Sequence, residues 1–570
     1  MKFSAWILII YSTLFTDLYA QEKAVQYVAP LNIPLALSAN FGELRSTHFH
    51  GGVDFKTKGV IGEPIVAVAD GYVSRVSVSP SGYGNAIYIN HPSQGVMVVC
   101  GHLSRYAPAV ANFIKKNQYN NKTFKIDLYL KPNDFPVKQG EIIGYSGNSG
   151  SSGGPHLHFE MRSLASGLML SPLKTCDITI TDNIPPKIVS LRVVEIDRNY
   201  GIPIHIPSGK YTSISRGGGK YVLSQDTITI NRDSYLAFEV TEVKSNSSNI
   251  FGVTSMRLLR GENEFWGYNI DHLSFDFGRA INGFKLYPES NHTRNDIIRT
   301  YVAPENKLSI YASKTNDGVI YKHELIAPQQ FTLVSEDENG NKSTLSFVVK
   351  AGNSATDVMP MPQGELVNAD KYYTHKDSVM EFSLSPYSLQ QSSFLNVWSE
   401  QDIKFSMSHV AVIADNVAPF NKSAKLLIKV DNSNGVALSK LLIGQLSPSG
   451  RVSSAGGAYS SGYVSTSVGA PGRYVVVCDT IRPKISPLFS SKNGVQSSIS
   501  FRISDDLSGI ESYNGYIDDK WVLFEYDAKS AVIKHTMDPS VIKKGGRHNL
   551  SLEVSDAKGN ISIYKTSLLW

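Results

Sequence analysis

The sequence of 570 residues predicts a mainly β protein built from several domains. The chain is too long for one hydrophobic core, so three or four domains are expected. Beyond Pro172, short runs of β-branched and aromatic residues are separated by Gly, Asn, Asp and Ser, which is typical of strands joined by tight turns. The 45 glycines, 29 tyrosines and 18% charged residues suit β-rich modules better than helical bundles.

The first twenty residues have the features of a signal peptide. Lys2 precedes a mostly apolar stretch, and Ala20 ends an acceptable cleavage site before Gln21. The stretch is short for a bilayer span, although an uncleaved anchor remains an alternative. No later segment reaches about 18 consecutive apolar residues. We therefore expect an exported chain with no integral membrane segment after cleavage.

Two histidine motifs about a hundred residues apart point to chemistry. Residues 155–161 alternate apolar side chains with others, as in a half-buried strand. His156 and His158 are two residues apart and should face the same way. Upstream, two glycines allow a tight turn that can bring His50 and Asp54 to one metal. Two histidines and a carboxylate form the ligand set of a catalytic zinc site, which predicts hydrolysis by metal-activated water.

Other polar residues are candidates for the surroundings of this cleft. His102 follows an apolar run and is expected at a strand end, available to a bound substrate. His48 precedes His50 by two residues and is expected to support the site or to border the substrate. Arg45 is expected either to bind a substrate carboxylate or to form a structural salt bridge. With Asn85, His48 and Arg45 form the predicted substrate-binding set.

An ordered series of motifs covers about a quarter of the chain, from Phe41 to Pro172. Their order and spacing resemble the LytM/lysostaphin-type zinc metallopeptidases, the M23 family, which cut peptide bonds in bacterial cell-wall peptidoglycan. The motifs include Phe41-Gly42 with Arg45, His50-x-x-x-Asp54, Gly82-Tyr83-Gly84-Asn85, Gly101-His102-Leu103, Gly147-Asn148-Ser149-Gly150 and Gly154-Pro155-His156-Leu157-His158.

The resemblance implies a role for each motif residue. It implies that His50, Asp54 and His158 hold one Zn²⁺ per catalytic domain. It makes His156 the general base and His102 the group that stabilises the oxyanion. It also implies a compact antiparallel β metallopeptidase domain, with the metal in a groove that suits an extended peptide.

Three features of this region depart from the family or need a separate interpretation. About twenty extra residues near 111–135 are expected to form a lid or a rim of the groove. Cys100 stands where the family often has tyrosine, and we expect it to affect packing only. The Gly/Ser run 147–154 is not followed by Gly-Lys-Ser/Thr, so a loop beside the cleft is expected rather than a phosphate cradle.

The rest of the chain predicts β modules with a degenerate internal repeat. The repeated segments resemble bacterial immunoglobulin-like sandwiches. The peptidase-like domain is expected at 31–175, followed by modules at 182–350 (with an insertion near 263–306), 352–478 and 479–570. The repeated pairs are 182–188 with 479–485, 236–240 with 499–503, and 337–341 with 556–560.

The net charge and the cysteine content argue against some other classes of protein. The 55 basic and 50 acidic residues give a net charge of +5, which predicts neither nucleic-acid binding nor strong attraction to anionic polymers. Cys100, Cys176 and Cys478 are an odd number and do not form a disulfide framework. A bridge between Cys176 and Cys478 remains open.

The resemblance and the motifs together predict a secreted zinc metalloendopeptidase that hydrolyses peptide cross-links of peptidoglycan. Its expected location is the periplasm, cell envelope or exterior of a bacterium. The expected partners are peptidoglycan peptide stems, with envelope proteins as candidates for the β modules, which otherwise act as spacers or as a cover. The alternatives are a non-catalytic envelope scaffold or activator of other wall hydrolases, and a peptidase of Gly-rich proteins. The presence of all three ligands and both accessory histidines favours the enzyme.

Overall fold

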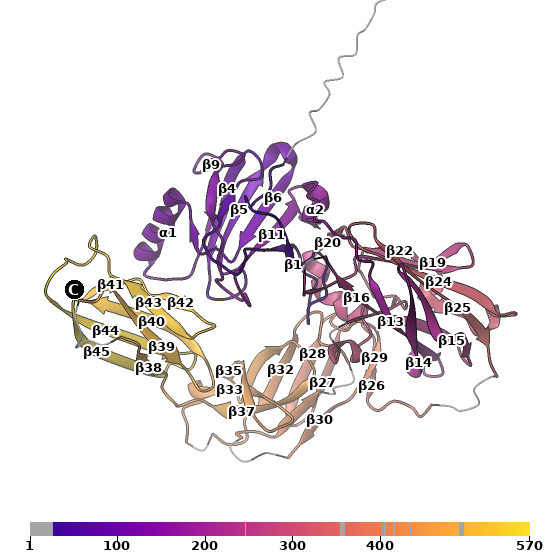
Figure 1. The fold of residues 1–570 in the computed structure, drawn as a ribbon. Coiled ribbons are helices and arrows are strands. Elements are labelled where there is room, and N and C mark those ends of the chain that lie inside the picture. Colours follow the sequence, from indigo (N-terminus) through magenta and orange to yellow (C-terminus); the bar gives the residue numbers. More distant parts are fainter. Residues whose placement is uncertain are drawn as a thin grey trace, which may run out of the picture.

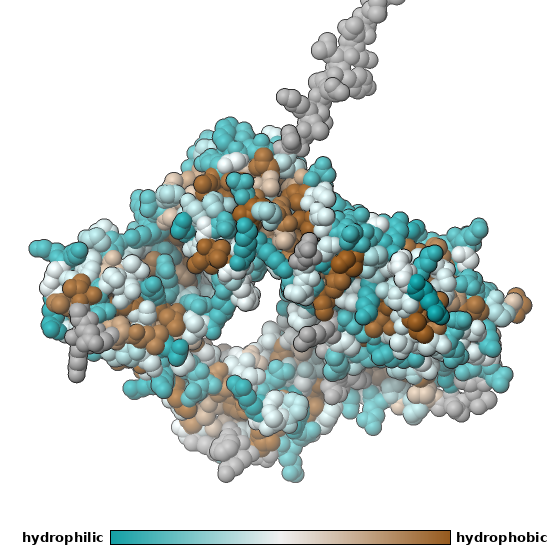
Figure 2. Space-filling view, viewed as in Figure 1, coloured by the Kyte–Doolittle hydropathy of each residue, from teal (hydrophilic) through white to brown (hydrophobic). Residues whose placement is uncertain are grey.

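The computed structural model describes residues 27–570, except 246, 294, 354–358, 402, 404–405, 414–416, 434 and 490–494. The predicted signal peptide, residues 1–20, lies outside the described residues. Strands dominate the described chain, which confirms the mainly β prediction. The β units follow one another around a ring (Figure 1), and the space-filling view shows an opening at its centre (Figure 2). None of the described helices is long and apolar enough to cross a membrane.

The first unit is an antiparallel sheet in which β11 lies between β2 and β6. Beside it is a smaller sheet with the order β3-β10-β7. The strands are β1 (Leu37–Ala39), β2 (Val53–Lys56), β3 (Pro64–Val66), β4 (Gly71–Val78), β5 (Asn85–His91), β6 (Val96–Gly101), β7 (Arg105–Tyr106), β8 (Ile126–Tyr129), β9 (Pro136–Val137), β10 (Ile142–Tyr145), β11 (His156–Ser163) and β12 (Met169–Leu170), with the short helices η1 (Pro92–Gln94) and α2 (Pro172–Thr175).

The alternating run near residue 156 forms strand β11, as predicted. Leu157 and Phe159 are fully buried behind the sheet, and the Phe159 ring lies 5.9 Å from the ring of Phe55 on β2. Because neighbouring side chains of a strand point to opposite faces, this packing directs His156 and His158 to the other face. The apolar core of the sheet thereby fixes the direction of both histidines.

The extra residues after His102 form helix α1 (Pro108–Asn121) and lead into β8. Val110 and Ile114 of α1 are buried in the core of the first unit. The opposite side of α1 faces the C-terminal module: Lys115 forms an ion pair with Asp538, and the Tyr119 ring meets the Trp521 ring edge-on at 5.3 Å. Helix α1 therefore contacts the C-terminal module and closes the ring between the first and the last unit.

The second unit is one twelve-stranded sheet that shares a continuous hydrophobic core with the first unit. Strand β20 pairs with β12 across the junction. Its elements are β13 (Lys187–Asp197), β14 (Ile204–Gly217), β15 (Lys220–Ile230), β16 (Ser234–Val243), β17 (Ile250–Phe251), β18 (Ser255–Arg260), β19 (Asn263–Asn269), β20 (His272–Leu273), η2 (Phe275–Gly283), η3 (Glu289–Asn291), β21 (Asp296–Arg299), β22 (Tyr311–Lys314), η4 (Thr315–Gly318), β23 (Val319–Ile320), η5 (Lys322–Glu324), β24 (Gln329–Glu336) and β25 (Lys342–Ala351).

The third unit has two five-stranded sheets around a core of its own. A two-stranded pair, β26 with β29, stands beside them. Its elements are β26 (Glu365–Val367), β27 (Tyr373–Lys376), β28 (Met380–Leu384), β29 (Ser393–Leu395), β30 (Val397–Glu400), β31 (Val410–Ile413), β32 (Ala424–Lys429), η6 (Leu438–Lys440), β33 (Leu441–Leu446), β34 (Val452–Gly456), β35 (Ala458–Ser460), β36 (Tyr463–Val468) and β37 (Gly472–Cys478).

The C-terminal module has two four-stranded sheets that enclose a third core, as in a sandwich. Its strands are β38 (Lys484–Pro487), β39 (Ser498–Ser504), β40 (Ile510–Ile517), β41 (Lys520–Val522), β42 (Glu525–Asp527), β43 (Val532–Thr536), β44 (Arg547–Asp556) and β45 (Ile561–Leu569). Several β-sheet modules thus follow the first unit, as predicted, while the exact module limits stay a prediction. Cys100, Cys176 and Cys478 are free thiols.

Candidate active site

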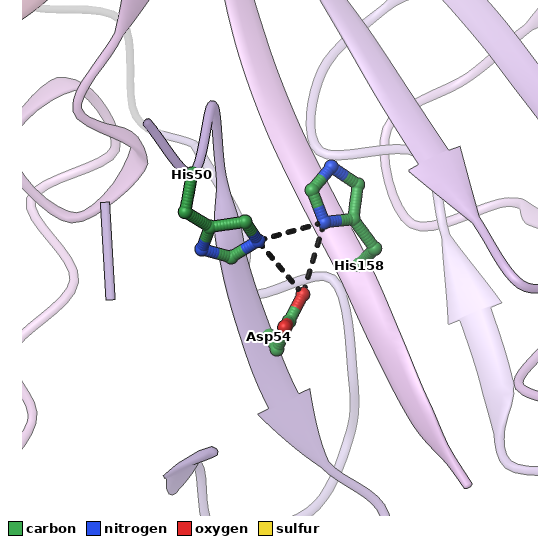
Figure 3. A group of neighbouring side chains, drawn as sticks. All are labelled: His50, Asp54 and His158. Atoms are coloured by element: carbon green, nitrogen blue, oxygen red, sulfur yellow. Dashed lines mark hydrogen bonds and ion pairs between the residues drawn. The ribbon is translucent and has the colours of Figure 1, made fainter. Parts of the chain in front are cut away.

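Two neighbouring strands and one turn bring the predicted metal ligands together. Asp54 on β2 lies directly opposite His158 on β11 in the antiparallel register. His50 precedes β2 in a turn whose backbone is held by Glu43, since the His50 amide donates to the Glu43 carbonyl at 2.9 Å. Figure 3 shows the three side chains pointing toward one another.

The donor atoms of these three residues are close enough for one small ion. Asp54 Oδ1 lies 2.9 Å from His158 Nδ1 and 3.2 Å from His50 Nε2, and the two ring nitrogens are 3.2 Å apart. Ligands of a tetrahedral zinc, with bonds of about 2.0–2.1 Å, lie roughly 3.3 Å apart. Because each of the three residues is less than a tenth exposed, few other groups compete for these donors. Two nitrogens and one carboxylate oxygen therefore fit the zinc that the sequence predicts.

The outer nitrogens of both histidines have partners that orient the rings. His50 Nδ1 donates to the Asn40 carbonyl at 2.8 Å, which leaves Nε2 free to bind a metal. His158 Nε2 lies 3.4 Å from the Glu160 carboxylate. That carboxylate accepts hydrogen bonds from Arg162 at 2.6 Å and from the Tyr83 hydroxyl at 2.8 Å. These partners place the proton of a neutral His50 on Nδ1 and that of a neutral His158 on Nε2.

Sequence reasoning missed these supporting groups, although one signal was available. Glu160 and Arg162 continue the two-residue spacing of His156 and His158 on β11, so all four lie on one face. The sequence around Asn40 contains no such spacing that could have indicated its role. Its side chain bonds to the backbone of Gly252 in the second unit, at 2.8 and 3.0 Å, a contact between residues far apart in sequence.

His156 and His102 lie together beside the three donors. Their ring centres are 4.8 Å apart, and His156 Nε2 lies 3.5 Å from Asp54 Oδ1. Each ring donates its Nδ1–H to a loop carbonyl at 2.8 Å, from His156 to Gly154 and from His102 to Ser149. In the neutral state, each ring therefore presents an Nε2 lone pair.

The site perturbs the proton affinities of its members. Burial opposes the charge of Asp54, but hydrogen bonds from the surrounding histidines outweigh it and hold the pKa of this carboxyl far below its usual value. Burial also opposes a charge on His158, yet hydrogen bonds to Asp54 and Glu160 raise its pKa to about 9. Burial and the neighbouring histidines lower the pKa of His102 to about 4. The carboxylate thus attracts a positive charge to the donors, while His102 stays neutral.

The residues predicted for the substrate rim are placed differently from one another. Arg45 lies 3.5 Å from Asp54 Oδ2 and 3.4 Å from Glu43 Oε1, so it takes part in ion pairs next to the ligands. Asn85 ties two loops together, because its side chain donates to the Leu103 carbonyl at 3.2 Å and its backbone amide donates to Ser149. His48 is exposed and contacts its neighbour Thr47 rather than the donors.

The Gly/Ser run 147–154, here the glycine loop, lies beside the candidate site as predicted. A cavity of about 720 Å³ is lined by part of this loop, by helix α1 and by the C-terminal module. Lys529 of that module donates to the carbonyl of Asn148 and, at 3.3 Å, to that of Ser152. The Ser152 hydroxyl lies 3.2 Å from His156 Nδ1. A residue almost four hundred positions downstream thus reaches the loop that holds His156.

Two segments match known protein families. Residues 48–123 match peptidase family M23, and residues 364–479 match the Zu5-like domain. The first match contains His50, Asp54 and His102. The second falls on the third unit of the ring.

Several curated proteins are similar to the first unit. DD-carboxypeptidase/endopeptidase Mpg of Neisseria meningitidis is 32% identical over 147 residues, which are 25% of this chain and 27% of that protein. Peptidoglycan DD-endopeptidase ShyC of Vibrio cholerae is 30% identical over 163 residues, 27% of this chain and 31% of that protein. The catalytic domain of lysostaphin from Staphylococcus simulans is 27% identical, with a TM-score of 0.19, over 24% of this chain and 89% of that chain. The chain thus spans about a quarter to a third of the length of these curated relatives.

Proposed function

We propose that this chain, which carries an M23-family peptidase domain, is an exported zinc metalloendopeptidase that hydrolyses peptide cross-links of bacterial peptidoglycan. The observation that carries the proposal is the convergence of His50, Asp54 and His158, with His156 and His102 beside them. The names of the similar proteins, which include peptidoglycan DD-endopeptidases, support the substrate class. Peptidoglycan lies in the cell envelope, so the proposed location agrees with the signal peptide predicted from the sequence.

The zinc fit rests on the chemistry of the donor set. Zinc prefers nitrogen and oxygen donors in a tetrahedral arrangement, and a catalytic site uses three protein ligands. In this role, the Asn40 carbonyl and the Glu160 carboxylate keep the two histidine ligands in the required orientation. When bound, the metal would supply Lewis-acid activation of water and of the scissile carbonyl.

We assign His156 as the general base that takes a proton from the attacking water. Its Nε2 lone pair lies on the same side as the donors, and its Nδ1–H is fixed by the Gly154 carbonyl. The ring is therefore pre-aligned to accept a proton without rotating. The same nitrogen can then return the proton to the leaving amine.

His102 is neutral in the free site and takes the oxyanion role after it gains one proton from the solvent, which it gives back when the intermediate collapses. Its Nδ1–H is used by the Ser149 carbonyl, so Nε2 becomes a donor only after it gains a proton. The negative charge that develops on the substrate carbonyl oxygen favours that protonated form. A donor at such a position is typically worth about 3–4 kcal/mol of transition-state stabilisation.

A non-catalytic envelope scaffold or activator is the second candidate function. The observation that favours it is the contact of Lys529 with the glycine loop, which brings the C-terminal module next to the candidate site. A chain used only for binding would not need all three metal donors, His50, Asp54 and His158, and here all three are present. The enzyme therefore remains the preferred proposal.

Purified peptidoglycan provides the test. The chain and its His158→Ala variant are compared for zinc content and for muropeptides released, with His323→Ala as a control, because His323 is exposed and lies in the second unit. We expect one zinc per chain and new peptide ends, both lost in His158→Ala and retained in His323→Ala. Bound zinc without cleavage would support the scaffold, and a chain that binds no zinc would contradict the enzyme.

A further inference from the structure

A group of buried carboxylates lies at the start of the second unit, apart from the histidine site. We call Asp182, Glu242, Asp337 and Glu338 the acidic cluster. Asp182 precedes β13, Glu242 lies on β16, and the other two belong to the turn between β24 and β25. One oxygen from each of the first three residues lies within 4.8 Å of the others. A single ion at about 2.3–2.6 Å, the usual calcium–oxygen distance, can reach all three.

Several oxygens of the acidic cluster are buried without a hydrogen bond. Glu242 is 1% exposed, and neither of its carboxylate oxygens has a hydrogen-bond partner among the described residues. The same holds for Asp182 Oδ2 and Glu338 Oε2. Asp182 Oδ1 and both oxygens of Asp337 do have partners: Asp182 accepts from the Ser245 amide at 2.8 Å, and Asp337 accepts from Asn341 at 2.8 Å. Buried carboxylates usually pair with a cation or bind a metal, so these free oxygens require a partner.

Lys244 does not satisfy this requirement by itself. Its ammonium is buried beside the cluster, 3.8 Å from Asp182, 3.9 Å from Glu242 and 3.8 Å from Glu338. These distances exceed the hydrogen-bond range. Among the described residues, Lys244 alone forms ion pairs with any of these four carboxylates, which leaves a formal surplus of three negative charges; Lys174 acts on Glu338 without such a pair. Burial raises the pKa of Glu242 to about 9, which agrees with a carboxylate that lacks a nearby stabilising group.

The C-terminal module repeats this arrangement. Asp479, Asp505 and Asp556 also place ligand oxygens within 4.8 Å of one another. The pairing of 236–240 with 499–503 puts Glu242 in correspondence with Asp505.

Hydrogen bonds confirm this correspondence. Asp182 accepts from the Ile184 amide as Asp479 accepts from the Ile481 amide. Asp337 and Asp556 each accept from the asparagine four residues later. Lys244 corresponds to Leu507, so a lysine at this position belongs to the first cluster alone, whereas in the C-terminal module Asp479 and Asp556 act on the charge of Lys558.

We propose that the acidic cluster binds one calcium ion through Asp182, Glu242 and Asp337, with the Glu338 carboxylate beside them. The donor set contains only oxygen, which suits hard cations. It does not suit zinc, which prefers nitrogen and sulfur donors. Calcium accepts irregular carboxylate cages, whereas magnesium demands octahedral geometry and keeps several waters. The buried carboxylates leave little place for such waters.

The site would fix the link between the peptidase domain and the second unit. The chain between α2 and β13 passes the cluster, where Asn339 donates to the Ile180 carbonyl at 2.6 Å and Asn341 donates to the Asp182 carbonyl at 3.3 Å. A bound ion would hold Asp182 of this link to β16 and to the β24–β25 turn. Calcium therefore acts on the joint between the units and not on the reaction.

The test uses the full chain, which is first freed of calcium with EGTA; the chelator is then removed and zinc is added so that the histidine site is filled. Titration with CaCl₂ is followed by calorimetry and by the melting temperature. We expect binding and, at about a hundredfold excess over Kd, a rise in melting temperature of about 5 °C. A chain that binds no calcium at millimolar concentration, or that responds equally to MgCl₂, would overturn the proposal.

Two variants and a matched control locate the ion. Glu242→Gln keeps the shape of the side chain, and we expect it to bind one calcium fewer than the wild type. Asp505→Asn, at the corresponding place in the C-terminal module, should retain the site of the second unit. If Glu242→Gln binds as much calcium as the wild type, the assignment is wrong.

Lys244→Leu keeps the test decisive if Glu242→Gln does not fold. This variant reproduces the residue of the C-terminal module and removes a competing positive charge. We expect its calcium affinity to rise by about tenfold or more. An unchanged affinity would show that no ion binds beside Lys244 and would overturn the proposal.

Discussion

His158 Nδ1 lies 2.9 Å from Asp54 Oδ1, across the antiparallel pair β2–β11, although the two residues are 104 positions apart in sequence. In the absence of a metal, this contact and the Glu160 carboxylate raise the pKa of His158 to about 9. A proton and a metal ion therefore compete for one nitrogen. The predictions below follow from this competition and from the groups around it.

Metal binding should release a proton from His158. At pH 7.5 the ring is protonated in the metal-free chain, because its pKa is raised to about 9, and a metal requires the neutral ring. Calorimetry of zinc binding in buffers of different ionisation enthalpy should detect release of about one proton. The release should decrease as the pH passes 9. Equal apparent enthalpies in all buffers at pH 7.5 would contradict the assignment.

The stability of the metal-free chain should depend on pH through His158. The pKa in the folded state is about 9, above the reference value of 6.5. The stabilisation by the bound proton is therefore complete below about pH 6.5 and is lost as the pH rises toward 9. Thermal unfolding in EDTA should show a falling melting temperature over this range. In His158→Ala this fall should be absent, and a fall of the same size would refute the prediction.

Glu160→Gln should weaken metal binding without changing the ligands. The variant keeps the size of the side chain but removes the negative charge of the carboxylate, which accepts hydrogen bonds from His158 Nε2 and Arg162 Nε. Loss of such a supporting group typically costs about 10- to 100-fold in metal affinity or activity. Competition with a zinc chelator measures the change, and Glu262→Gln, at an exposed turn, is the control. An affinity like that of the wild type would show that Glu160 does not orient the ligand.

His102→Ala should reduce kcat far more than it reduces zinc content. His102 lies beside His156 and is not among the three converging donors. Loss of an oxyanion donor typically lowers kcat by about 10²–10³. Zinc analysis and the rate of muropeptide release separate the two effects. A variant that loses its zinc would place His102 among the ligands instead.

Lys529→Ala should loosen the glycine loop. The Lys529 ammonium donates to carbonyls of Asn148 and Ser152, and the variant removes both bonds. Hydrogen exchange of residues 147–154 should become faster, whereas Lys543→Ala, which changes an exposed lysine of the same module, should leave it unchanged. Equal exchange in both variants would show that the C-terminal module does not restrain this loop.

Local patterns in the sequence determined much of the first unit. The alternation of apolar residues near Phe159 predicted strand β11, and its two-residue spacing predicted that His156 and His158 share a face. The position of His102 directly after β6 was also predicted. These inferences succeeded because the direction of a side chain on a strand depends on its immediate neighbours. The order of the motifs also predicted the similarity to peptidase family M23 that residues 48–123 show.

The tertiary structure alone decided how distant segments complete the site. Asn40 is held by Gly252 of the second unit, and the glycine loop is held by Lys529 of the C-terminal module. No local periodicity encodes such contacts, because they depend on the register between strands and on the angles at which whole units pack. The repeated aspartates were visible in the sequence. The burial of Glu242 and of Asp182 Oδ2 without hydrogen-bond partners, which suggests a cation, became apparent only when β16 and the β24–β25 turn met around them.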